Sequence, residues 1–199
     1  MHSHGPRSAL IVVDVQNDFA DPAGSLFVRG APTILPAVVA EIDAAARSGA
    51  VVVYTQDWHP AHTPHFAADG GIWPVHCVGG TWGAELHASL PTTGPRVRKG
   101  TNGEDGYSGF TVRDVVAGTT APTELEAILR DAGVEDVAVC GLATDYCVKA
   151  TAIDAAALGF RTTLLRDAVA AVDLVAGDGH RAIEAMAAAG VSIATTARA

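Results

Sequence analysis

The stretch Asp136-Val-Ala-Val-Cys-Gly-Leu-Ala-Thr-Asp-Tyr-Cys-Val148 decides the fold. Its first five residues form an apolar run typical of a buried strand, and apolar residues at helical spacing continue from Val148 to Leu158. Gly141 favours a turn between the two, and Thr144 and Asp145 are residue types that cap helices. We therefore expect Cys147 at the start of a helix that directly follows a buried strand.

A cysteine at a helix start has two interpretations. The free N–H groups and the partial positive charge of the first turn favour a thiolate, lowering the pKa from about 8.5. The same N–H groups can stabilise the oxyanion that forms when sulfur attacks a carbonyl. Alternatively, Cys147 is a small buried hydrophobic residue, as most cysteines are. The rest of the chain has to decide between them.

Strands and helices alternate along the chain. Apolar runs predict strands near residues 9–14, 50–54, 96–99, 136–140, 160–165 and 191–193, and helical periodicity predicts helices near 34–47, 124–132, after 147, and 179–189. This alternation predicts an α/β protein with three αβα layers, in which a mostly parallel sheet of about six strands carries helices on both faces. We find no linker and no repeat, so residues 1–199 are expected to form one domain.

Composition excludes several classes of partner. The net charge is −9, and no cluster of lysine and arginine is present, which disfavours binding to nucleic acid or to an anionic membrane. Only three cysteines occur, an odd and low number that predicts a reducing compartment, the cytoplasm. Composition leaves open whether the protein is a monomer or a homo-oligomer.

Polar residues stand at the ends of the predicted strands. In parallel α/β sheets the functional site lies beyond the carboxyl ends of the strands, which is where Asp14, Asp57, Lys99 and Cys147 fall. Asp14 is a candidate base for the Cys147 proton, and Lys99 a candidate cation to stabilise the resulting charges. Taken singly, Asp14 suits a loop-capping carboxylate and Lys99 a surface lysine. Their convergence on three neighbouring strand ends favours a catalytic triad.

The long irregular segment from Trp58 to Pro95 is rich in histidine, and a loop of this length is usually functional. Three imidazoles and one carboxylate suit one divalent ion of zinc, iron or manganese; the candidate ligands are Asp57, His59, His65 and His76. Histidines that are simply exposed to solvent are the alternative, and His62 competes with His65 for one ligand position.

Three aromatic residues, Phe19, Trp73 and Tyr107, stand near these segments. Such residues can enclose a flat ring, although Phe19 and Trp73 are equally suited to core packing.

These residues fall within motifs of a known family. The motifs are Val13-Asp-Val-Gln-Asn-Asp-Phe19, Asp57-Trp-His-Pro60, Trp73-Pro-Val-His-Cys77, Lys99-Gly100, Tyr107-Ser-Gly-Phe110 and Gly141-Leu-Ala-Thr-Asp-Tyr-Cys-Val148. In their order and spacing, from Ala9 to Val191, the chain resembles the nicotinamidases (pyrazinamidases) among the isochorismatase-like cysteine hydrolases.

The resemblance implies a role for each candidate residue. It implies a triad of Asp14, Lys99 and Cys147, and a divalent metal held by Asp57, His59, His65 and His76. It also implies an oxyanion hole from the backbone N–H groups of Ala143 and Cys147, a cis peptide bond between Leu142 and Ala143, and a ring pocket of Phe19, Trp73 and Tyr107. Many family members place the second histidine nearer the first, where Thr63 stands here, but Phe66 after His65 favours His65.

The activity that the resemblance implies is hydrolysis of nicotinamide, and of pyrazinamide, to the acid and ammonia through a thioester on Cys147, within NAD salvage. The same triad would serve other amide or ureide hydrolases, and a relative that binds small molecules without catalysis is a further alternative.

Overall fold

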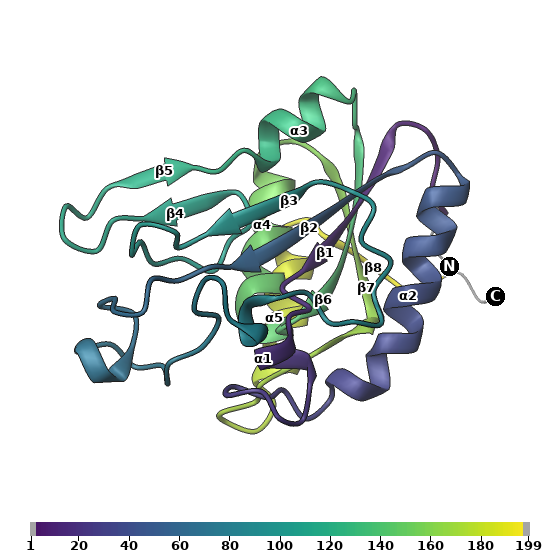
Figure 1. The fold of residues 1–199 in the computed structure, drawn as a ribbon. Helices are drawn as coiled ribbons and strands as arrows, with labels where there is room; N and C mark the ends of the chain where they lie inside the picture. Colours follow the sequence, from purple (N-terminus) through teal and green to yellow (C-terminus); the bar gives the residue numbers. More distant parts are fainter. Residues whose placement is uncertain (1–2, 197–199) are drawn as a thin grey trace.

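A six-stranded sheet forms the centre of the computed structural model, which describes residues 3–196 (Figure 1). Every neighbouring pair in it is parallel. In spatial order the strands are β3 (Arg96–Lys99), β2 (Val51–Asp57), β1 (Ser8–Val13), β6 (Asp136–Leu142), β7 (Arg161–Ala170) and β8 (Ser192–Ala194). The predicted parallel sheet of six strands is therefore confirmed.

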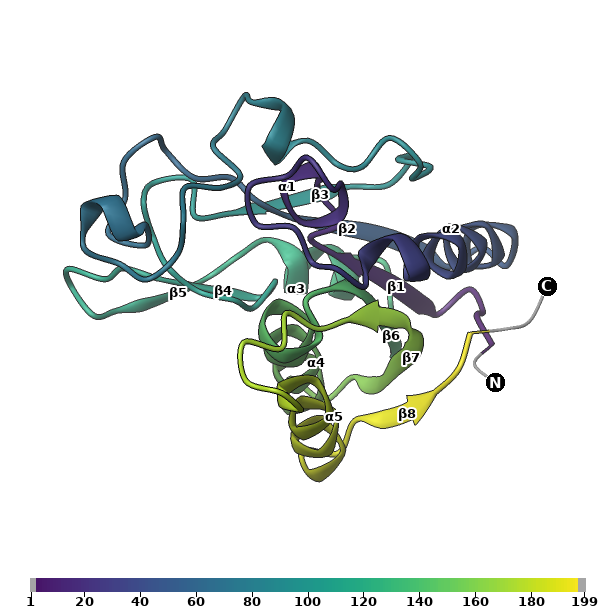
Figure 2. The same ribbon diagram turned by 90° about the horizontal axis from the view of Figure 1, so that it is seen from below.

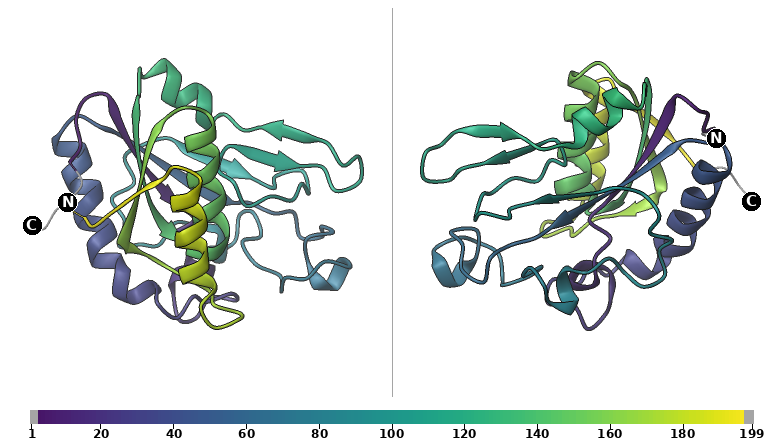
Figure 3. Two further views of the ribbon diagram at one scale, coloured as in Figure 1. Left: turned by 180° about the vertical axis from the view of Figure 1, so that it is seen from behind. Right: turned by 45° about the horizontal axis from the view of Figure 1, so that its top comes forward.

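Helices cover both faces of the sheet, as predicted (Figures 2 and 3). One face packs against α2 (Ala31–Arg47), and the other packs against α3 (Leu125–Asp131), α4 (Lys149–Ala157) and α5 (Asp178–Ala188). Alternate residues of β1 enter the two cores, with Leu10 in the α2 core and Ile11 in the other. Burial on both faces explains why the strands are continuous apolar runs. Among residues 3–196, no helix is long and apolar enough to cross a bilayer.

The strand order reverses between β1 and β6, because the chain builds the sheet outward from β1 to β3 and then returns to the other side of β1. Ligand sites of open α/β sheets lie at such a reversal. Gly141 pairs with Val13 there, at φ +109°, and a Cβ at position 141 would lie 2.2 Å from the Val13 carbonyl oxygen. Only glycine therefore allows the end of β6 to approach the end of β1 so closely.

The sequence patterns did not predict several short helices and strands. The helix α1 (Asn17–Ala20) and the hairpin of β4 (Thr111–Arg113) and β5 (Thr120–Pro122) are too short for a periodic pattern, and the hairpin extends away from the sheet in Figure 1. Within the predicted irregular segment lie two 3₁₀ turns, η1 (Ala67–Asp69) and η2 (Trp82–Ala84).

The turn that carries Cys147 also differs from prediction. It is a single π-helical turn, η3 (Thr144–Val148), without a side-chain cap, and α4 begins only after it. The prediction that Thr144 or Asp145 caps a helix is therefore wrong. The Asp145 carboxylate instead accepts hydrogen bonds from the backbone N–H groups of Val172, at 3.0 Å, and Asp173, at 2.9 Å. Asp145 thus ties the Cys147 turn to the segment that follows β7.

Candidate active site

The buried amine of Lys99, at the end of β3, connects the predicted triad. Its Nζ lies 2.9 Å from Asp14 Oδ2 and 3.7 Å from Cys147 Sγ, and it donates a hydrogen bond to Asp57 Oδ1. The expectation of three neighbouring strand ends needs correction, because β2 lies between β3 and β1. The long Lys99 side chain bridges that gap across Asp57 at the end of β2.

The charges of this cluster follow from its burial. Burial acts to lower the pKa of Lys99, but the charges of Asp14 and Asp57 raise it well above its usual range, so the amine is protonated. Burial alone raises the pKa of Asp57, yet Lys99 and the neighbouring histidines outweigh burial and hold it at about 2. For Asp14, burial prevails over Lys99 and raises the pKa. A carboxylate with a raised pKa is a stronger base.

The Cys147 thiol differs from the expectation for a helix start. Burial raises its pKa well above the usual range, and the attraction of Lys99 opposes this without prevailing. The residue is only 7% exposed, and its sulfur lies within 4.8 Å of carboxylate oxygens of both Asp14 and Asp57. These negative charges disfavour a further anion at the sulfur. Burial and the neighbouring carboxylates therefore favour the thiol over the thiolate.

Asp14 itself is held by a residue that sequence reasoning missed. Thr55 Oγ1, in β2, donates a 2.6 Å hydrogen bond to Asp14 Oδ1, while the Asp14 backbone takes the positive φ of +48°. Thr55 is fully buried. The sequence signal that could have identified Thr55 is a polar residue near the end of an otherwise apolar strand.

The histidine cluster lies beside this triad. Nitrogen atoms of His59, His65 and His76 all lie within 4.8 Å of one another, and all three residues are buried. Asp57 Oδ2 lies 3.9 Å from the Nε2 atoms of both His59 and His76. The competing His62 has an 88% exposed side chain and lies 3.3 Å from Asp69 instead. The structure therefore brings His65 into the cluster and leaves His62 outside it.

The cluster fits a divalent metal. Both ring nitrogens of His59 are buried and lack a hydrogen-bond partner within residues 3–196, a costly arrangement that a bound cation would relieve at one of the two nitrogens. Burial lowers the pKa of His59 to about 4 and also lowers that of His76, so both rings are neutral. Neutral imidazole is the form that binds metal. Asp57 supplies a carboxylate within reach of the same position.

Short backbone pairings assemble the loop that carries these histidines. The His59 N–H donates to the Cys77 carbonyl at 2.9 Å, and the Gly79 N–H donates to the His59 carbonyl at 2.8 Å. Two buried side chains that follow β1 hold further backbone groups of this region. Gln16 bonds both backbone groups of Asp57, and the Asp18 carboxylate accepts from the Cys77 N–H at 2.7 Å.

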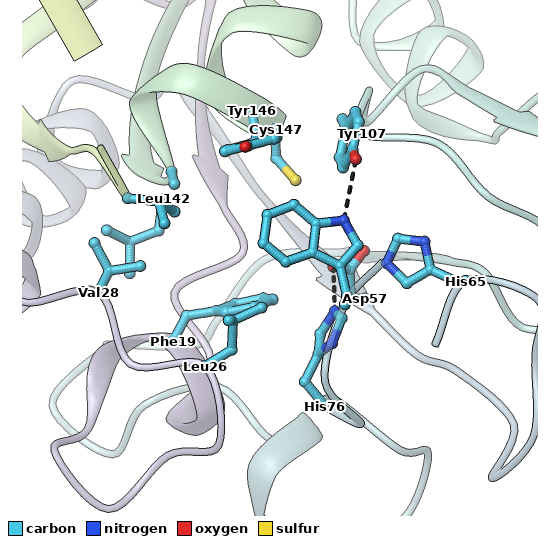
Figure 4. A pocket seen from close by; sticks show the side chains of 13 residues that line it. Phe19, Leu26, Val28, Asp57, His65, His76, Tyr107, Leu142, Tyr146 and Cys147 are labelled. Atoms are coloured by element: carbon cyan, nitrogen blue, oxygen red, sulfur yellow. Dashed lines mark hydrogen bonds and ion pairs between the residues drawn. The ribbon is translucent and has the colours of Figure 1, made fainter. Parts of the chain in front are cut away.

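A small cavity opens between the triad and the histidines. Figure 4 shows the Cys147 sulfur pointing into it, with His65 and His76 on one side and Leu26 and Val28 on another. All three predicted aromatic residues line it, and Trp73 Nε1 donates a 3.1 Å hydrogen bond to Tyr107 Oη. The lining residues are Phe19, Leu26, Val28, Asp57, His65, Trp73, His76, Tyr107, Leu142, Ala143, Tyr146, Cys147 and Val172.

Part of that lining was not foreseen. Sequence reasoning missed Leu26, Val28 and Val172, because apolar residues in loops carry no distinguishing pattern. It also missed Tyr146, which stands beside Cys147 in η3. The Tyr146 ring packs edge-on against the rings of Trp73 and Tyr107, with ring centroids 5.0 Å and 5.3 Å apart. Trp73, Tyr107 and Tyr146 together form an aromatic wall of the cavity. The peptide bond between Leu142 and Ala143, at the cavity wall, is cis, as the family resemblance implied.

Residues 8–198 match the model of the isochorismatase domain. The chain belongs to the isochorismatase family. It is 35% identical to a nicotinamidase of Escherichia coli over 96% of both chains.

Two solved structures of similar proteins extend this family assignment. The first is the pyrazinamidase of Pyrococcus horikoshii in complex with zinc, which is 42% identical and superimposes with a TM-score of 0.86 over 96% of this chain and 99% of that one. The second is the PnC1 protein of L. infantum in complex with nicotinate, 37% identical with a TM-score of 0.86 over 98% and 96% of the two chains. The family assignment thus agrees with the fold and with the resemblance in the motifs.

Proposed function

We propose that this isochorismatase-family chain hydrolyses nicotinamide to nicotinate and ammonia, and pyrazinamide in the same way, within NAD salvage. One observation carries the proposal: the buried Lys99 amine contacts Asp14, Asp57 and the Cys147 sulfur at once, beside three clustered histidines. The similarity to a nicotinamidase and to a structure with nicotinate supports the choice of substrate.

The first half of the reaction forms a thioester. Asp14 removes the proton of the Cys147 thiol as the sulfur attacks the carboxamide carbon, and the C=O electron pair moves onto oxygen. The backbone N–H groups of Ala143 and Cys147 are proposed to bind that oxyanion, since both residues line the cavity. The tetrahedral carbon then expels its nitrogen, which takes the proton from Asp14 and leaves as ammonia. Lys99 keeps its own proton and stabilises the negative charges.

The second half of the reaction releases the acid. Asp14, again a carboxylate, removes a proton from water as the water oxygen attacks the thioester carbon. The same N–H groups bind the new oxyanion. Collapse breaks the C–S bond, and the sulfur takes back its proton from Asp14. The product leaves as the acid and becomes nicotinate when it loses the remaining proton of the water to solvent. The raised pKa of Asp14 suits a group that must both accept and return a proton.

One divalent metal ion is proposed at Asp57, His59, His65 and His76, with zinc, iron and manganese as candidates. When bound, it supplies a Lewis-acid position that orients a ring nitrogen. The zinc in the Pyrococcus horikoshii structure supports a metal at this site.

The cavity wall favours a neutral, flat substrate over other amides or ureides. Aromatic and aliphatic side chains make up most of it, and neither lysine nor arginine is among its lining residues within 3–196. Lys99 contacts the sulfur from behind this wall and already pairs with Asp14 and Asp57. A substrate that carries its own carboxylate would therefore find no unpaired cationic side chain in this wall. We also infer that the enzyme works in the cytoplasm, because its three cysteines are free thiols.

An ammonia-release assay over nicotinamide, pyrazinamide, maleamic acid and acetamide tests the proposal, with wild type and with Cys147→Ala. We expect turnover of the two azine amides only, and none by the variant, whose circular dichroism should match wild type. Turnover of maleamic acid above nicotinamide would point to another hydrolase of the family. Binding of nicotinamide without ammonia release would point to a non-catalytic relative.

A further inference from the structure

We infer that Asp105, outside the cavity, is a positioning residue that fixes the ring of the metal ligand His65. The inference rests on the proposed metal site but needs no particular substrate. His65 Nδ1 lies 2.7 Å from Asp105 Oδ1. Because a carboxylate can only accept, the Nδ1 atom carries the proton, and the Nε2 atom keeps its lone pair for a cation. A carboxylate in this position also makes the imidazole a stronger ligand.

The three histidines are held in three different ways. His76 Nδ1 lies 2.7 Å from the carbonyl oxygen of Pro74, a neutral acceptor two residues away in the chain. In the described part of the chain, His59 has no hydrogen-bond partner at either ring nitrogen. Among the three histidines, only His65 has a carboxylate hydrogen-bonded to its Nδ1 atom. That carboxylate, of Asp105, lies 40 residues further along the chain. The geometry of the cluster therefore depends on a segment that contributes no ligand.

That segment is built to hold Asp105 in place. The Asp105 N–H donates to the Arg113 carbonyl at 2.8 Å, and the Arg113 N–H donates back to the Asp105 carbonyl at 2.6 Å. The Gly106 N–H donates to Asp105 Oδ1 at 2.8 Å, which fixes the side chain. Arg113 ends β4, so the β4–β5 hairpin supports the metal ligand from outside.

The experiment measures zinc affinity of the purified full chain by competition with a chromophoric chelator. Asp105→Asn and Asp105→Ala are the test variants. Glu104→Gln is the matched control, because it removes a charge one residue away from Asp105, on a carboxylate that accepts hydrogen bonds from the local Asn102. We expect zinc affinity to fall about tenfold in Asp105→Asn and up to about a hundredfold in Asp105→Ala. The control should bind like wild type.

A second measurement separates positioning from a general loss of structure. With cobalt(II) as the probe, the visible absorption of the bound ion reports its ligand geometry. We expect both Asp105 variants to change that spectrum while their far-ultraviolet circular dichroism stays that of wild type. An unchanged zinc affinity and cobalt spectrum in both variants would overturn the inference, and so would an equal change in Glu104→Gln.

The outcome is independent of the substrate. If the protein fails to release ammonia from nicotinamide, yet loses zinc affinity on Asp105 substitution, the proposed reaction fails and the positioning role stands. If wild type releases ammonia but binds neither zinc nor cobalt, the reaction stands and the positioning role is overturned.

Discussion

The two halves of the site are built in different ways. The triad half stands on strand ends, with Asp14 after β1, Lys99 at the end of β3 and Cys147 after β6. The histidine half stands on a loop that a few side chains and short backbone pairings secure, among them Gln16 and Asp18. Strand ends are fixed by the sheet, whereas the loop is fixed by individual contacts. Substitutions should therefore affect the two halves differently.

The largest effect is expected in the triad half, from Lys99→Met. The change leaves Asp14 and Asp57 buried without their cation, which should lower the free energy of unfolding by about 3–5 kcal/mol. Ammonia release should fall by about 10⁴-fold, as when one member of a catalytic triad is lost. Thermal melting and the ammonia assay measure the two losses.

The matched control is Lys149→Met, the same change at a partly exposed position at the start of α4. It should alter stability by less than about 0.5 kcal/mol and leave turnover intact. Equal losses of stability and of ammonia release in the two variants would contradict the proposed role of Lys99 in the triad.

The next effect tests the sheet beneath the triad. Gly141→Ala places a Cβ against the Val13 carbonyl oxygen and should destabilise the fold by more than about 4 kcal/mol. Gly159 has a similar positive φ, +87°, but no described atom beyond its chain neighbours lies within 4 Å of the Cβ that Gly159→Ala would add. We therefore expect this variant to lose only about 1 kcal/mol of unfolding free energy. Urea unfolding followed by fluorescence compares them. If Gly141→Ala costs no more than Gly159→Ala, β6 can move away from β1 and the strand ends are less rigid than argued.

The difference between the halves also explains what the sequence alone could predict. The meeting of Asp14, Lys99 and Cys147 was predictable because polar residues that end apolar runs lie at one edge of a parallel sheet. The ionisation of Cys147 was not, since it depends on burial next to two carboxylates that no local pattern encodes. The histidines were visible as a cluster, but Asp105 was not, because it lies in an irregular segment that a single bridge to Arg113 of the short strand β4 holds.

Metal removal tests the histidine half. Treating the zinc-loaded protein with a chelator should lower its stability by about 3 kcal/mol, the effect of losing a ligand present at a hundred times its dissociation constant. Amide hydrogen exchange should rise around His59 and His76, and stay slow in β6. In His59→Ala the chelator should change little, because a ligand is already missing. Faster exchange throughout β6 would mean that the metal supports the sheet as well as the loop.

The smallest effect concerns Trp73, the part of the aromatic wall that belongs to the loop half. Trp73→Phe keeps an aromatic ring in the cavity but removes the hydrogen bond to Tyr107 Oη, worth about 1 kcal/mol. If that bond serves mainly to hold the wall for substrate binding, KM for nicotinamide should rise about fivefold with kcat nearly unchanged.

The control for this last change is Trp82→Phe. That indole is 53% exposed and does not line the cavity, so steady-state kinetics should match wild type. Should Trp73→Phe instead lower kcat and leave KM unchanged, the indole would act on the transition state. The loop half would then take part in the chemistry that the strand ends are proposed to perform, and the division between the two halves would fail.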